Sequence, residues 1–357
     1  MGHASEGIRT ADSKSKGAII EYLIKEAPEF QRLCALRQKG WDNRAGDKYF
    51  KIQRRRADNA DKKTARHFYN MMKSVANEMN QSTDVFWLKS SSLEEPEPHI
   101  LDMCMAPGGF LSAALRLNPT AHALAFSLPQ CKGGHGVLLP PSLKVTLKFL
   151  DITMLAADMG MVPASIPDAH PDANNFILST QFAPAQSFNL VLCDGQVLRT
   201  HERASYRERR EATRLTTAQL ALALEHLKPG GSIILLLHKV EAIYSVRMLY
   251  TLDKFASVRL FKPKSAHATR SSFYMIATDV RADCEDATEA VKHWKSVWKA
   301  ATFETDEVYY EVMSEEGTDV EGMLKEFGPR LVELGKEVWN TQADALERAP
   351  FVKNAAS

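Results

Sequence analysis

Short apolar runs alternate with helical patterns through the middle of this 357-residue chain, and this alternation limits the possible folds more than any other feature. Seven runs have the length and apolar content of buried strands: His99–Met105, His122–Leu128, Val145–Ile152, Phe188–Asp194, Ser232–Lys239, Ser257–Pro263 and Ser271–Val280. Helical spacing lies between some of them, at Gly108–Leu117, Arg203–Leu227 and Glu241–Leu252. This order predicts an α/β fold in which a mostly parallel sheet carries helices on both faces.

The two ends of the chain differ from this central region. Residues 1–17 are small, polar and charged, which predicts a disordered leader. We expect a helical, basic N-terminal extension over residues 18–95 and the α/β domain over residues 96–282. Residues 283–357 are acidic with helical spacing, which predicts a helical appendage whose surface is available to a protein partner.

Charge and cysteine content exclude several classes of protein. The 45 Lys and Arg residues nearly balance the 44 Asp and Glu residues, so the net charge of +1 does not favour a nucleic-acid coat protein or a membrane-surface protein. The five cysteines are odd in number and lack metal-ligand spacing, so neither a disulfide framework nor a zinc site is predicted. No window approaches the ~18 apolar residues of a membrane span. We expect an intracellular protein of the cytoplasm or nucleus, without a membrane partner.

A basic segment lies ahead of the first predicted strand. Between Arg44 and Lys73, ten Lys and Arg residues stand against three Asp residues, a local balance of +7. Such a run is often a solvated helix face. Aromatic residues lie within or beside it: Trp41, Tyr49, Phe50, Phe68 and Tyr69. Because bases stack on exposed rings, a nucleic-acid groove is the second interpretation, and both stay open here.

A glycine turn follows the first predicted strand. The sequence Ile100 to Phe110 runs from an apolar strand into Ala106-Pro107-Gly108-Gly109, which opens a helix. Glycines in such a turn let the backbone approach a ligand closely, and the helix N-terminus offers free N–H groups. The turn is neither Gly-x-Gly-x-x-Gly nor a P-loop. The acidic Asp102 at the strand favours a cationic, amine-bearing ligand over a phosphate.

Four motifs, in order, resemble those of the FtsJ-type RNA ribose 2′-O-methyltransferases, which include cap-ribose enzymes. The first is Asp102 to Phe110, similar to the family's S-adenosylmethionine-binding turn. The second is Phe149-Leu150-Asp151, and the third is Phe188 to Gly195 with Asp194 at its end. The fourth is Leu227 to Lys239, followed by a block resembling the family's last, from Phe261 to Tyr274. The resemblance implies a Rossmann-like methyltransferase fold with a seven-stranded sheet.

The resemblance also implies the site residues. The family uses a Lys-Asp-Lys-Glu tetrad, and this nominates Lys73, Asp194 and Lys239 as catalytic, with Lys62 and Lys63 as fallbacks for the first lysine. In that arrangement Lys239 is the base, Lys73 a neighbouring cation that lowers its pKa, and Asp194 the orienting acid. The implied positions around S-adenosylmethionine are Asp102, Cys104, Ala106, Pro107, Gly108, Gly109, Phe110, Ser127, Asp151 and Asp194. No metal is needed for this mechanism.

Three positions depart from the family pattern. Ser272 stands where the tetrad has Glu, and His267 stands where Arg is usual. Ser127 also replaces the acidic residue that often binds the cofactor ribose. We expect an S-adenosylmethionine-dependent methyltransferase acting on a ribose 2′-hydroxyl of RNA. The alternatives are a catalytically degenerate module that binds cofactor or RNA, and an O-methyltransferase for a small molecule.

Overall fold

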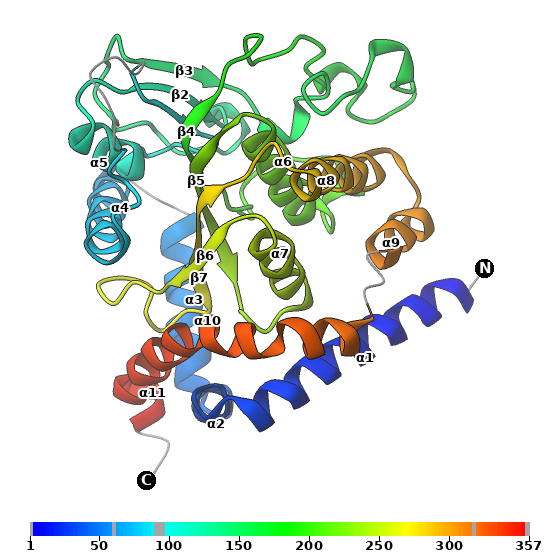
Figure 1. Ribbon diagram of the computed structural model, residues 1–357. Helices are drawn as coiled ribbons and strands as arrows, with labels where there is room; N and C mark the ends of the chain where they lie inside the picture. Colours follow the sequence, from blue (N-terminus) through cyan, green and yellow to red (C-terminus); the bar gives the residue numbers. More distant parts are fainter. Residues whose placement is uncertain (1–2, 59–61, 89–96, 316–318, 354–357) are drawn as a thin grey trace.

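Seven strands form one sheet across the middle of the molecule, within the residues that the computed structural model describes, 3–58, 62–88, 97–315 and 319–353 (Figure 1). The strands are β1 (His99–Asp102), β2 (His122–Ser127), β3 (Val145–Phe149), β4 (Phe188–Cys193), β5 (Leu227–His238), β6 (Ser257–Phe261) and β7 (Ser272–Val280). Their order in the sheet is β3-β2-β1-β4-β5-β7-β6. The pairs from β3 to β5 are parallel, and β7 runs antiparallel to both β5 and β6. The predicted α/β fold with a mostly parallel seven-stranded sheet is confirmed.

Helices surround the sheet on both faces. They are α1 (His3–Glu26), α2 (Pro28–Trp41), α3 (Arg44–Asp58), α4 (Lys62–Thr83), α5 (Gly109–Leu117), α6 (Glu211–Glu225), α7 (Ile243–Asp253), α8 (Glu285–Phe303), α9 (Asp306–Glu315), α10 (Val320–Arg348) and α11 (Pro350–Lys353). Helix α6 starts later than the predicted Arg203, because residues 203–210 form a loop with one 3₁₀ turn, Ser205–Arg207. No helix among the described residues combines the length and apolarity needed to cross a bilayer.

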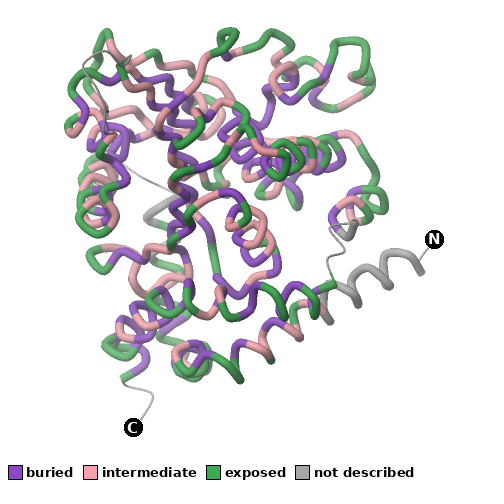
Figure 2. Tube along the Cα trace, viewed as in Figure 1, coloured by how far each residue is buried: buried purple, intermediate pink, exposed green. Residues whose placement is uncertain are grey.

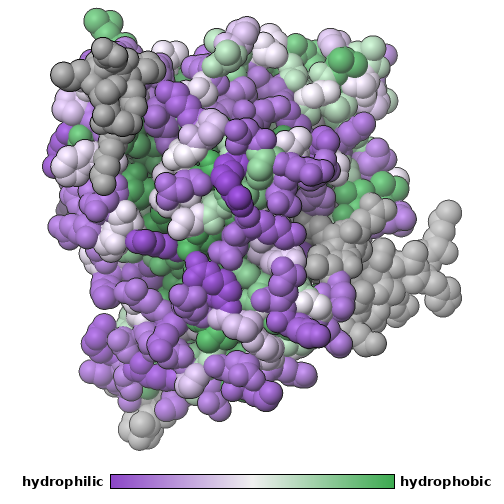
Figure 3. Space-filling view, viewed as in Figure 1, coloured by the Kyte–Doolittle hydropathy of each residue, from purple (hydrophilic) through white to green (hydrophobic). Residues whose placement is uncertain are grey.

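Alternate strand residues point to opposite faces of the sheet, which produces two separate apolar cores. One core joins Ile100, Leu192 and Ile234 of the strands to α4 and α5. The other joins Leu101, Val191 and further strand residues to α6, α7, α8 and the terminal helices. Figure 2 shows the buried strands at the centre and exposed residues on the outer sides of the helices. On the face drawn in Figure 3, hydrophilic residues predominate and hydrophobic ones are visible mainly between them.

The N-terminal and C-terminal helices pack on each other below the sheet (Figure 1). Phe30 of α2 lies 5.2 Å from Trp339 of α10, measured between ring centres. Arg32 of α2 pairs with Asp344 and Glu347 of α10, each at 2.7 Å. The two extensions therefore form one helical layer around the sheet, although 300 residues separate their contacts in the sequence.

The predicted disordered leader over residues 1–17 is corrected by the structure, in which α1 is helical from His3 onward. Ile19 and Leu23, in the second half of α1, are fully buried. Once that half is fixed by packing, each further residue toward the N-terminus adds one helical hydrogen bond without a new nucleation cost. The charged, polar composition of the leader therefore did not reveal its helical state.

Candidate cofactor and active site

The strand order reverses at β1 and β4, and ligands on such sheets bind beyond the carboxyl ends of the strands at this point. Cys104 follows β1 and Asp194 follows β4, and both line a cavity of about 230 Å³. Further predicted cofactor residues line the same cavity: Ala106, Pro107, Phe110 and Ser127. The structure thus brings six of the ten predicted cofactor positions to one cavity.

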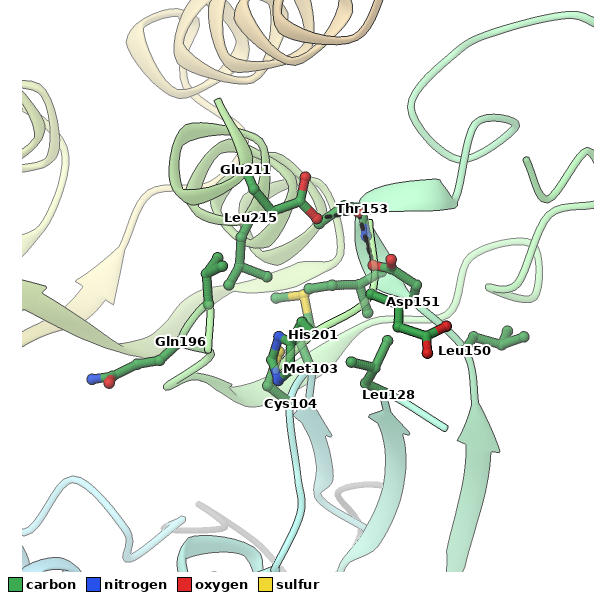
Figure 4. Close-up of a pocket in the computed structure, with 13 residues that line it drawn as sticks. Met103, Cys104, Leu128, Leu150, Asp151, Thr153, Gln196, His201, Glu211 and Leu215 are labelled. Carbon is green, nitrogen blue, oxygen red and sulfur yellow. Dashed lines mark hydrogen bonds between the residues drawn. The ribbon is translucent and has the colours of Figure 1, made fainter. Parts of the chain in front are cut away.

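Asp151 lies in a smaller adjoining cavity of about 60 Å³ (Figure 4). Its Oδ1 accepts hydrogen bonds from the Thr153 backbone N at 3.0 Å and the Thr153 hydroxyl at 2.8 Å. The two cavities share four lining residues: Cys104, Leu128, Gln196 and His201. The two cavities therefore adjoin, with Asp151 in the wall of the smaller one and Asp194 in the wall of the larger one.

Two carboxyl groups lie at the larger cavity: Asp194 is half-buried in its wall, whereas Asp102 is buried. Asp102 is 1% exposed, and its Oδ1 accepts a 3.3 Å hydrogen bond from the Cys104 N–H. Burial, and then the charge of Asp194, raise the pKa of Asp102 well above its usual range. Burial likewise raises the pKa of Asp194 to about 7. Neither carboxyl pairs with a cation among the described residues. A positively charged group of a ligand would therefore be stabilised beside them.

Gly108 and Gly109 shape the turn but do not line the cavity. Gly108 has a φ of 101°, which glycine adopts without strain, and it caps the N-terminus of α5. A Cβ on Gly109 would lie 2.5 Å from both the Met72 Cβ and the Tyr69 carbonyl oxygen of α4. Gly109 is therefore needed for the close packing of α4 against α5, and α4 supplies Met71 and Met72 to the cavity wall.

Neither predicted lysine lines the cavity that contains Asp194. The Lys73 ammonium lies 5.4 Å from the ring centre of Tyr69, and Lys73 does not line the cofactor cavity. Lys239 is exposed and lines a different cavity, with a left-handed φ of 54°. The catalytic roles of Lys73 and Lys239 therefore stay a prediction. Lys63, a fallback, lines a third cavity beside α3 and α4.

Leu236, and not Lys239, is the residue of β5 that lines the cofactor cavity. Ile234 belongs to the core on the α4 and α5 face, so the next side chain of β5 on that face is Leu236. Leu236 pairs with Tyr274 across β5 and β7, and both line the cofactor cavity. Lys239 follows the end of the strand with a left-handed φ of 54°, so the alternation along β5 does not extend to its side chain.

Sequence reasoning missed the polar groups that do line the cavity. They are His135, Gln196, His201, His267 and Arg270. Burial lowers the pKa of His135 and of His201, so both rings are neutral at pH 7. Burial, with the nearby charges of Arg270 and Lys262, lowers the pKa of His267 to about 4. In the sequence, the signal for these polar residues was that His267 stands where the family usually has Arg.

Lys262 fixes the loop that carries His267 and Arg270. Its ammonium is buried and donates to the carbonyl oxygens of His267, Arg270 and Ser272 at 2.8, 2.6 and 2.5 Å. His267 has a left-handed φ of 55°, a conformation that costs free energy for a residue other than glycine. The three hydrogen bonds hold it there.

A buried ionic network supports the Asp151 end of the site. Arg214 is fully buried and donates to Glu211 Oε2 at 2.7 Å and to the Thr153 carbonyl oxygen at 2.9 Å. Arg207 lies 3.2 Å from Glu211 and 3.5 Å from Asp151. These arginines fix the Thr153 backbone, which in turn orients Asp151.

The basic segment forms α3 and α4. Its Arg44, Lys48, Lys51, Arg55, Lys63 and Arg66 side chains are exposed, whereas Arg54 and Arg56 have side chains outside the described part. Phe50 packs on Phe351 at 5.6 Å between ring centres, and Phe68 lines the cofactor cavity. Trp41 is 64% exposed. The segment is thus a solvated face in part, with some rings directed to cavities.

The family model for FtsJ-like methyltransferases matches residues 81–280, which is more than half of the chain. The chain belongs to the FtsJ-like methyltransferase family. The matched span includes Asp102, Asp151 and Asp194 and ends with β7. This family membership confirms the class that the four ordered motifs predicted, with S-adenosylmethionine as its cofactor.

Solved structures give further likenesses. An O-methyltransferase family protein from Burkholderia thailandensis shares 10% identity, covering 62% of this chain and 61% of that one, with a TM-score of 0.32. An rRNA methylase from Streptococcus thermophilus shares 11% identity over 57% of this chain and 96% of its own, with a TM-score of 0.31. TrmN from Thermus thermophilus shares 14% identity over 58% of this chain and 48% of its own, at 0.31. This chain thus spans about half to three-fifths of the first two proteins matched in the structure comparison. Curated proteins gave no significant match.

Proposed function

We propose that this FtsJ-like protein transfers a methyl group from S-adenosylmethionine to a ribose 2′-hydroxyl of RNA. The observation that carries the cofactor assignment is the pair of buried Asp102 and cavity-lining Asp194, which has no cation partner among the described residues. A sulfonium and an amino group supply the positive charge that this pair lacks. Asp151, in the wall of the smaller cavity, would accept hydrogen bonds from the nucleoside portion.

When bound, S-adenosylmethionine supplies an electrophilic methyl group on a positively charged sulfur. The residues of this chain must then orient the acceptor hydroxyl and take its proton. The described lining residues of the cofactor cavity include no lysine. We assign the proton to the imidazole of His267, because it is neutral at pH 7 and lines both the cofactor cavity and the neighbouring one.

The neighbouring cavity, of about 520 Å³, gives the acceptor nucleotide its route to the cofactor. It shares Phe68, Met71, His267 and Arg270 with the cofactor cavity. Tyr49, Lys63 and His67 line its other parts. Aromatic rings and cations together suit a nucleotide, because bases stack on rings and phosphates pair with cations. The charge of Arg270 lowers the pKa of His267, so a phosphate paired with Arg270 would raise that pKa again.

One observation favours a second candidate, a module that binds cofactor and RNA without catalysis. Leu236 occupies the position of β5 that faces Asp194, and Ser272 is on β7 opposite His238. Neither of these two positions therefore supplies a lysine or a glutamate to the cavity.

The test is a transfer assay with labelled S-adenosylmethionine on an RNA and on DNA of the same sequence. We expect labelled RNA and unlabelled DNA, because only RNA has the 2′-hydroxyl. Label in neither polymer, from a protein that binds the cofactor by calorimetry, would support the second candidate. Equal label in both polymers would place the methyl group on a base and contradict the proposal.

A further inference from the structure

A cavity of about 550 Å³ lies between the terminal helices and the end of β5, and most of its wall lies outside the span matched by the family model. Helices α2 and α3 supply Arg37, Trp41 and Phe50, and the C-terminal helices supply Gln342 and Phe351. The remaining wall comes from the end of β5 and the 269–271 loop. The methyl-transfer chemistry described above uses none of the terminal-helix residues.

Arg270 marks the point where this cavity meets the two cavities of the proposed active site. Its side chain lines all three. The guanidinium is partly buried, and burial lowers the pKa of Arg270. No hydrogen bond or ion pair of this guanidinium occurs among the described residues. A partly desolvated arginine without an acceptor is a binding position for an anion, and its planar donors match phosphate oxygens.

Lys239 adds a second cation on the same wall. Its side chain is exposed and has no ion pair within the described chain. The left-handed backbone at φ 54° is held by hydrogen bonds from Lys239 N to the Ser271 oxygen and from Ala242 N to the Lys239 oxygen, both 2.9 Å. By contrast, Arg37 is already paired with Glu241 at 2.6 Å. Asp47 is the one carboxylate in the wall, so Lys239 and Arg270 outnumber it.

Aromatic side chains also line this cavity. Trp41, at the C-terminal end of α2, is 64% exposed, and Phe50 is a second ring in the cavity wall. An exposed indole stacks with a nucleobase, which is worth about 1–3 kcal/mol per base in single-stranded complexes. Cations and an exposed ring in the wall of one cavity are the features that a nucleotide with its phosphate requires.

We propose that this cavity binds the nucleotide next to the methylated one. Arg270 and Lys239 hold the connecting phosphodiester, and Trp41 stacks on the neighbouring base. The proposal rests on the proposed function, because the occupant is the RNA substrate. It assigns Lys239 to substrate binding and gives the terminal helices a part in selecting single-stranded RNA.

The experiment measures binding of a labelled single-stranded oligoribonucleotide by fluorescence anisotropy at several salt concentrations. The variants are Lys239→Ala and Trp41→Ala, with Lys292→Ala of α8 and Trp87→Ala as matched controls for an exposed lysine and an exposed tryptophan. We expect each site variant to weaken RNA binding about five- to tenfold, with cofactor affinity unchanged. Lys239→Ala should also reduce the slope of log affinity against log salt by about 0.7, the value for one phosphate of a single strand.

The outcomes separate this proposal from the proposed function. If the site variants bind RNA like the controls, or if the wild type binds no RNA, the cavity is not a nucleotide site. Methyl transfer to RNA with an unchanged KM in both site variants would also overturn the inference while leaving the function intact. Loss of RNA affinity in the site variants of a protein that transfers no methyl group would support this site and contradict the proposed activity.

Discussion

The carboxyl pair makes the site sensitive to pH. Asp194 has a pKa of about 7, raised by burial, and Asp102 is raised as well. A cation placed beside them lowers both pKa values. Cofactor binding must therefore release protons at any pH at which these carboxyls are protonated in the free protein. Affinity is therefore lower at pH 6 than at pH 8, because protonated carboxyls must first ionise.

We expect the affinity for S-adenosylmethionine to rise up to about tenfold per pH unit between pH 6 and 7 and to level off above pH 8. Calorimetry in two buffers of different ionisation enthalpy measures the protons released. Asp194→Asn is the control, and it should bind more weakly with a flatter pH dependence. A dissociation constant independent of pH, with no proton release, would show that the pair does not meet the cofactor.

The role assigned to His267 gives a separate kinetic prediction. His267→Gln should lower kcat by about 10²–10⁴-fold, the usual contribution of general acid–base catalysis, with cofactor affinity nearly unchanged. The pH profile should lose its rise through the His267 pKa, which a purely structural role would leave in place. His122→Gln is a matched control at an exposed histidine paired with Glu97. A His267→Gln enzyme with the wild-type rate and pH profile would remove His267 from the mechanism.

Among the contacts between helices, the packing of α4 on α5 determines the shape of the cofactor cavity. Gly109→Ala would place a Cβ 2.5 Å from the Tyr69 carbonyl oxygen, which is backbone and cannot rotate away. We expect α4 to be displaced, with a loss of about 1–3 kcal/mol in the free energy of unfolding and weaker cofactor binding. Denaturant unfolding measures the first effect and calorimetry the second. Gly17→Ala, with nothing within 4 Å of the added Cβ, should not destabilise the protein.

An unaltered unfolding free energy in Gly109→Ala would show that the helices can separate at no cost. The contact between Gly109 and α4 would then not determine the width of the cavity.

The elements of the α/β domain were predictable from sequence because each strand is a separate apolar run and each turn has its own signal. Asp194 was predictable for the same reason, since it ends such a run. A motif gives order along the chain but not the face of the strand, so it could not show that Lys239 lines a different cavity from Asp194. His267 and Arg270 could not be found from local pattern, since their place depends on Lys262 holding three carbonyl oxygens of a folded loop.

At the scale of the whole molecule, Arg37 links four distant segments. It donates from α2 to Glu241 beyond β5 at 2.6 Å and to Gln342 of α10 at 2.8 Å. Gln342 in turn donates to the Thr269 carbonyl oxygen at 3.3 Å, in the loop that carries Arg270. The terminal helices therefore support the active-site loop directly.

Removing one partner of this buried pair should be costly. Arg37→Met leaves the Glu241 carboxylate buried without its cation, which should lower the free energy of unfolding by about 3–5 kcal/mol. The double variant Arg37→Met with Glu241→Leu should lose much less than the sum of the two single changes. Denaturant unfolding of the four proteins gives the coupling. Additive losses would mean that the ion pair does not connect the terminal helices to the domain.

Alkaline hydrolysis of RNA methylated with labelled S-adenosylmethionine tests the central claim most directly. Alkali cleaves RNA through attack by the free 2′-hydroxyl, so a 2′-O-methyl group protects the adjoining phosphodiester. We predict that the label appears in alkali-resistant dinucleotides. Label in mononucleotides, which marks methylation of a base, or the absence of label from RNA under conditions where the protein binds the cofactor, would contradict it.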